Sequence, residues 1–225
     1  SLEFWAGWAG VEYDDAMLED DTGFFAFGDL AYYVTDDWRV SIGGASVLAI
    51  EILGTRIIGP FYGVSIFLWS ALIAVTLAAL SAGYALGGRW ADRNPALRRY
   101  AGIFVAAGVW IALIPVLRGP VVAAARPLGH RTAMLVTSLV LFFPPLAALG
   151  MVSPFALKLR ARSVDEVGRA AGDLYAVSTL ASVVAALLTG FFLIPSFGVT
   201  RLTAAIGIVL VAPGALGAVG KRKAR

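Results

Sequence analysis

The chain has 225 residues, of which 59% are hydrophobic and 15% are charged, and its mean hydropathy is +0.81. A soluble domain carries about a quarter charged residues, and several apolar runs here reach the roughly 20 residues that a helix needs to cross a bilayer. The composition therefore excludes an ordinary soluble domain and predicts an all-α integral membrane protein.

The lack of cysteine and the single histidine further limit the reactions and metal sites that this chain can support. The sequence has no cysteine and one histidine, His130, in a polar loop. A disulfide framework, a thiolate metal site and a cysteine nucleophile are thereby excluded, and a histidine-based metal site is not expected. We expect no metal, no cofactor and no nucleic-acid partner.

Residues 1–40 form an acidic segment that differs from the rest of the chain. They hold ten of the fifteen acidic residues and one base, Arg39. The stretch GFFAFGDLAYYVTDDWRVSIGG alternates in the manner of strands around a polar TDD turn, which favours a β-hairpin. A single hairpin cannot span a membrane, because a barrel needs at least about eight strands. A peripheral, amphipathic segment at the membrane interface is the other interpretation.

Six transmembrane helices are predicted in a domain over residues 41–220, which a basic tail at 221–225 follows. The predicted spans are 42–59, 64–87, 100–117, 132–156, 174–195 and 200–219. The first of them is short and carries two charges.

The orientation of these spans is predicted from lysine and arginine alone. Thirteen of these residues flank one side and four flank the other. The bias predicts a multi-pass protein of the bacterial inner membrane with both ends of the domain in the cytoplasm. Three arginines in the 118–131 loop run against this pattern.

The first span contains the stretch IEILGTRIIGP, which places Glu51 and Arg56 in an otherwise apolar run. Ionisable residues inside a membrane are costly and mark a functional site by default. On a helix Thr55 shares a face with Glu51, whereas Arg56 points about 140° away. Glu51, Thr55 and Arg56 are therefore candidates for intramembrane binding or pairing. The alternative is that Glu51 packs against a partner and that Arg56 extends to the interface.

A second signal is GYALGGRWADRNPALRR, Gly83 to Arg99, where a helix ends and a basic loop begins. Asp92 is expected to accept hydrogen bonds from the amides of the next helix or to pair with an arginine. The stretch resembles the G-x-x-x-D-R loop between helices 2 and 3 of the major facilitator superfamily, which is cytoplasmic. The matching residues are Gly88, Asp92, Arg93, Arg98 and Arg99. An ordinary solvated basic turn is the alternative.

The third signal is AAGDLYAVSTLASVVAALLTGFFLIPSFG, where Asp173 and Tyr175 stand at the start of a span rich in small residues. Both are candidates for binding, although an acid at a helix N-terminus is also favourable on its own. Prolines recur in and near the spans, at Pro115, Pro144–Pro145 and Pro195 among others. Each removes a backbone donor, so protein or a cavity must satisfy the freed carbonyl.

Over residues 44–218 the chain resembles the membrane domain of the bacterial fused MFS/spermidine synthase family, chiefly in the Glu51–Arg56 and Gly172–Tyr175 stretches. The resemblance implies a bundle like half of a major facilitator protein, completed by a second copy or a partner. It also implies a polyamine or related cation as ligand, received by Glu51 and Asp173, with Arg56 available for an anionic group.

The sequence lacks the glycine-rich loop that an aminopropyltransferase domain of that family needs. It also lacks HExxH, G-x-S-x-G and an i, i+4 carboxylate pair in its spans. We therefore expect no enzymatic activity from this chain alone. The leading hypothesis is a transporter-like membrane module, and the alternative is a non-catalytic anchoring or accessory subunit of a larger membrane complex.

Overall fold

The computed structural model describes residues 22–93, 97–160 and 167–219. The chain divides into two compact units, residues 1–35 and 36–225. The contacts between helices and the cavity described below all belong to the second unit.

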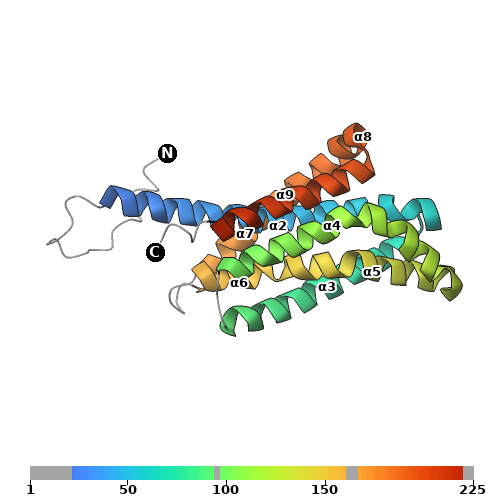
Figure 1. Ribbon diagram of the computed structural model, residues 1–225, viewed down its shortest axis with the longest axis horizontal. Coiled ribbons are helices and arrows are strands. Elements are labelled where there is room, and N and C mark those ends of the chain that lie inside the picture. The colour runs from blue at the N-terminus through green and yellow to red at the C-terminus, as the bar shows by residue number, and fades with distance from the viewer. Residues whose placement is uncertain (1–21, 94–96, 161–166, 220–225) are drawn as a thin grey trace. The chain divides into compact units, whose positions relative to one another are not determined.

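The described residues form helices joined by short turns (Figure 1). In chain order they are α2 (Thr22–Tyr62), α3 (Ile66–Arg93), α4 (Leu97–Ala125), η1 (Arg126–Leu128), α5 (His130–Gly150), α6 (Val152–Arg160), α7 (Val167–Leu188), η2 (Thr189–Leu193), α8 (Ile194–Phe197) and α9 (Val199–Val219). Three of the turns pass through glycines with positive φ, Gly63, Gly129 and Gly198, a conformation that glycine adopts without steric cost.

The predicted all-α membrane class is confirmed. Five continuous helical segments are long and apolar enough to cross a membrane: Val40–Tyr62, Ile66–Arg93, Arg98–Leu128, His130–Lys158 and Val167–Phe197. The sixth predicted span corresponds to α9, whose apolar stretch is the shorter Val199–Ala212. The first span, expected to be short, covers 23 residues because the helix continues on both sides of the predicted limits.

Helix α2 also covers the stretch for which the alternation of apolar residues predicted a β-hairpin. The backbone is helical from Thr22 onward. Extending an existing helix costs much less than nucleating one, so a strong apolar helix over the first span allows its N-terminal neighbours to continue it. Residues 1–21 lie outside the described residues, and the interfacial interpretation of the acidic segment stays a prediction.

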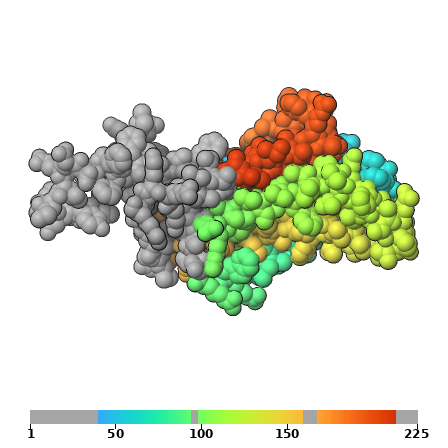
Figure 2. Space-filling model, viewed as in Figure 1, coloured from blue at the N-terminus to red at the C-terminus, as the bar shows by residue number. Residues whose placement is uncertain are grey.

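The bundle is held together by helices that approach one another at glycines. Helix α4 packs along α9, and α3 packs along α5 (Figures 1 and 2). At the first of these contacts Gly108 and Gly207 face each other, and a Cβ on Gly207 would lie 2.5 Å from the carbonyl oxygen of Gly108. At the second, a Cβ on Gly83 would collide with the carbonyl oxygen of Ala147. Glycine at position 83 therefore lets the backbones of α3 and α5 come into contact.

The proline pair in α5 leaves a carbonyl that another helix satisfies. Pro145 has no N–H, so the carbonyl oxygen of Leu141, four residues earlier, loses its helical donor. The indole nitrogen of Trp110, on α4, donates a hydrogen bond to that oxygen at 3.1 Å. The expected compensation for a proline at membrane depth is therefore visible here, as a side chain from a neighbouring helix.

Helix α7 differs from the other long helices because little of it is covered. Only 6% of its most apolar stretch is buried within the chain, against 33–56% in the other four candidate spans. It continues into the π-helical turn η2 and then reaches Pro195, and the chain reverses at Gly198 before α9. The face of α7 that is covered meets α2 and lines the cavity described next.

Candidate functional site

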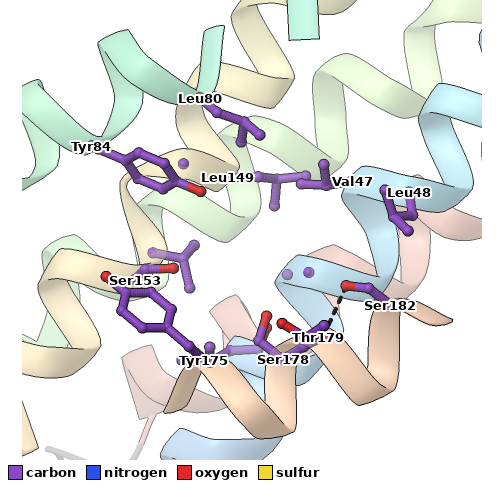
Figure 3. Close-up of a pocket in the computed structure, with 15 residues that line it drawn as sticks. Val47, Leu48, Leu80, Tyr84, Leu149, Ser153, Tyr175, Ser178, Thr179 and Ser182 are labelled. Carbon is purple, nitrogen blue, oxygen red and sulfur yellow. Dashed lines mark hydrogen bonds between the residues drawn. The ribbon is translucent and has the colours of Figure 1, made fainter. Parts of the chain in front are cut away.

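A cavity of about 310 Å³ lies between α2, α3, the α5–α6 junction and α7 (Figure 3). It is close to the lower end of the range of about 300–1,000 Å³ that is usual for small-molecule sites. The residues that line it belong to the middle of α2, the later part of α3, the last turn of α5, the start of α6 and the middle of α7. It therefore lies in the half of the bundle nearer the arginine-rich ends of these helices.

The polar part of the lining consists of hydroxyl groups, without any charged side chain. The residues that carry them are Tyr84 of α3, Ser153 of α6 and Tyr175, Ser178, Thr179 and Ser182 of α7. In Figure 3 the serines and the threonine of α7 face Leu80, Leu149 and Val47 across the space. The α7 side of the cavity is thus polar, and the opposite side is mainly aliphatic apart from the hydroxyl of Tyr84.

Helices α2 and α7 come very close beside this cavity, because α2 presents a glycine there. A Cβ on Gly44 would collide with the Ser178 hydroxyl and lie 2.9 Å from the Ser182 hydroxyl. The Ser178 hydroxyl lies 3.5 Å from the carbonyl oxygen of Val40 on α2, to which it donates. Glycine at position 44 therefore lets the polar face of α7 reach the backbone of α2.

Glu51 lies just beyond the cavity. Seven residues make nearly two helical turns, so Glu51 shares a face of α2 with Gly44 and follows the lining residue Val47 by one turn. It is half-buried, and within the described part of the chain no hydrogen bond or ion pair engages its carboxylate. The structure thus brings the predicted intramembrane acid next to the cavity, although not into its lining.

Neither Thr55 nor Arg56 lines the cavity. Thr55 is buried, and its hydroxyl donates to the carbonyl oxygen of Ile52 in its own helix at 2.9 Å. Arg56 is exposed and, among the described residues, forms no ion pair with Glu51. The expectation that the two charges of this stretch do not neutralise each other agrees with this arrangement.

Asp173 and Tyr175 also differ in their position relative to the cavity. Tyr175 lines the cavity, whereas Asp173 is exposed and does not. Two residues correspond to about 200° around a helix, so the two side chains leave α7 on nearly opposite sides. Of the five predicted intramembrane residues, the structure therefore places one in the lining and one beside it.

The residues of the loop motif form a separate group at the arginine-rich end. Gly88, Asp92 and Arg93 belong to the last turns of α3, while Arg98 and Arg99 open α4 and are exposed. Among the described residues Asp92 forms an ion pair with Lys158 of α6 at 3.0 Å and none with an arginine. Both side chains are largely exposed, and such pairs contribute at most about 1 kcal/mol. The partner comes from a distant part of the sequence, so spacing within the motif did not indicate it.

Sequence reasoning missed most of the cavity lining. Ser178, Thr179 and Ser182 recur at helical spacing in the stretch YAVSTLAS and so share a face with Tyr175. That periodicity was the available signal for a polar face on α7. Gly44 and Tyr84 gave no comparable signal, because their role depends on which helices become neighbours.

In the part of the chain that the structure describes, no group of three or more His, Asp or Glu side chains is arranged to hold a metal ion. The chain matches no family model, no curated protein and no solved structure. The resemblance to the fused MFS/spermidine synthase family therefore stays a prediction.

Proposed function

We propose that this chain is a transporter-like module of a multi-pass membrane protein, which takes a small organic cation into the cavity between α2, α3 and α7. The proposal assigns no catalytic step to the chain. The resemblance of the Glu51–Arg56 and Gly172–Tyr175 stretches to the fused MFS/spermidine synthase family suggests a polyamine or related cation. It also suggests the bacterial inner membrane and a second copy or partner that completes the path.

The observation that carries this proposal is the position of Glu51 beside a hydroxyl-lined cavity. Inside a membrane an ionisable group normally faces the bundle interior or a water-filled space and marks a substrate or ion pathway. Within the described residues Glu51 has no ion-pair partner, and it continues the face of α2 that lines the cavity. A carboxylate so placed suits a cationic solute better than an anionic one.

The test is uptake of radiolabelled spermidine, putrescine and methylammonium into proteoliposomes that contain the purified chain. The Glu51→Gln variant keeps the shape of the side chain and removes its charge. We expect it to abolish uptake or binding while purification yield and unfolding temperature stay unchanged. A matched control is Arg56→Gln, which removes an exposed charge on the same helix and should retain uptake. Normal uptake by Glu51→Gln would contradict the proposal.

A second candidate function, an anchoring or accessory subunit, is favoured by the uncovered face of α7. Large apolar side chains stand exposed along α7 and η2, namely Val177, Leu180, Val183, Val184, Leu187, Leu188, Phe191 and Phe192. Such a face can meet lipid or the helix of another subunit. Native mass spectrometry in mild detergent separates the two functions. A homodimer favours the carrier, and co-purification with a larger membrane assembly or a soluble enzyme favours the subunit.

A further inference from the structure

The two serines that face the cavity from α7 already donate their hydroxyl protons in hydrogen bonds to backbone carbonyls. Ser182 donates to the carbonyl oxygen of Ser178 at 2.8 Å, and Ser178 is placed to donate to the carbonyl oxygen of Val40 at 3.5 Å. A carbonyl oxygen only accepts, so the serine is the donor in both cases. The remaining lone pairs of both hydroxyl oxygens are then available, so these two oxygens can accept hydrogen bonds from a ligand.

The surroundings of these two oxygens disfavour a negative ligand. None of the residues that line the cavity is charged, and Glu51 follows on the same face of α2 one turn beyond Val47. An anion placed against Ser178 and Ser182 would meet two acceptor oxygens, with the Glu51 carboxylate further along the same face of α2. A cation with N–H groups would instead form charge-assisted hydrogen bonds, which are about twice as strong as neutral ones.

The opposite wall limits the rest of the ligand. Val47, Leu80 and Leu149 stand across from the serines of α7 (Figure 3). A linear polyamine would bring a second ammonium group against these aliphatic side chains, beside the Tyr84 hydroxyl, where a charge without a carboxylate partner is unfavourable. The volume of about 310 Å³ is also small for a ligand site. One ammonium group on a compact apolar body matches both walls.

We propose that the cavity binds a primary ammonium ion on a compact apolar body, whose nitrogen donates to Ser178 and Ser182 while Glu51 supplies the compensating charge. The inference rests on the proposed function in taking this cavity as the solute site. It narrows the solute from a small cation to a monoamine with free N–H groups.

The test uses isothermal titration of the chain in lipid nanodiscs, with empty nanodiscs to correct for partitioning. The probes are cyclohexylammonium, its N,N,N-trimethyl derivative and cyclohexanecarboxylate. The trimethyl compound keeps the charge and lacks N–H donors, and the carboxylate reverses the charge. We expect binding of cyclohexylammonium, at least about tenfold weaker binding of the trimethyl compound, and none of the carboxylate.

Variants of residues that line the cavity test where cyclohexylammonium binds. Ser178→Ala combined with Ser182→Ala should weaken cyclohexylammonium binding about tenfold. The exposed serines Ser70 and Ser196 serve as a matched double alanine control that leaves binding unchanged. Val47→Phe, which fills the space from the aliphatic side, should abolish binding, and the unfolding temperature of each variant checks that it remains folded.

The outcomes separate this inference from the proposed function. Equal binding of the trimethyl compound, binding of the carboxylate, or full binding by folded Ser178→Ala/Ser182→Ala would overturn the inference. Amine binding without uptake in proteoliposomes would keep the inference and contradict the transporter. Uptake of a cation that binds independently of both serines would keep the transporter and contradict the inference.

Discussion

Glu51 and Arg56 lie five residues apart on one helix and have different surroundings. Glu51 is half-buried beside the hydroxyl-lined cavity, while Arg56 is exposed. In a bilayer a long arginine side chain can reach the interface, whereas a short carboxylate must find its environment within the bundle. The proposed function accounts for an acid at this position, because water or a cation in the cavity would compensate the charge of the Glu51 carboxylate.

Also at the scale of single residues, Trp110 compensates for a proline within α5. Its indole donates to the Leu141 carbonyl, which Pro145 leaves without a backbone donor. We expect Trp110→Phe to lower the free energy of unfolding by about 1–3 kcal/mol, because it leaves a carbonyl unsatisfied. In a Pro145→Ala background the same change should cost less, since the alanine supplies the missing N–H.

A double-mutant cycle measured by denaturant titration in mixed micelles checks this coupling. Trp90→Phe is the control, because Trp90 is exposed on α3. Equal costs of Trp110→Phe with and without Pro145 would show that the hydrogen bond contributes nothing.

At the scale of the elements, pairs of helices approach until one backbone meets the other. Helices α4 and α9 meet at Gly108 and Gly207, and α3 and α5 meet at Gly83 and Gly150. Apolar side chains gain little by leaving lipid for a protein interior, so close packing and not hydrophobicity holds such helices together.

Adding one methyl group at these contacts should therefore be costly. We expect Gly108→Ala to lower the free energy of unfolding by about 1–3 kcal/mol, because the new Cβ would lie 2.5 Å from the carbonyl oxygen of Gly207. Gly102→Ala in the same helix meets no atom within 4 Å, and it should be neutral or stabilising by up to about 1 kcal/mol. Denaturant titration of both variants measures the difference, and equal effects would disprove the close contact.

At the scale of the whole molecule, the asymmetry of positive charge predicts which side of the membrane each loop faces. The native chain has no cysteine, so single cysteines report topology without further substitutions. Trp90 and Leu128 are both exposed, near opposite ends of the bundle, and neither is charged. We expect an impermeant maleimide to label Leu128→Cys on intact cells and Trp90→Cys only after the membrane is opened. The reverse pattern would overturn the predicted orientation.

The sequence by itself determined the membrane class and nearly all of the spans, because about 20 apolar residues in a row leave few alternatives to a helix across a bilayer. It also identified Glu51 as unusual, since that judgement depends on residue type within a single helix.

Only the tertiary structure decided which helices became neighbours, and with them the composition of the candidate site. Tyr84, Ser153 and Ser182 come from three different helices, and Lys158 of α6 meets Asp92 of α3 across a long stretch of sequence. Helical periodicity fixes the face on which a residue lies but not the helix that faces it. That choice depends on packing at small residues such as Gly44, and so the cavity could not be predicted from spacing along the chain.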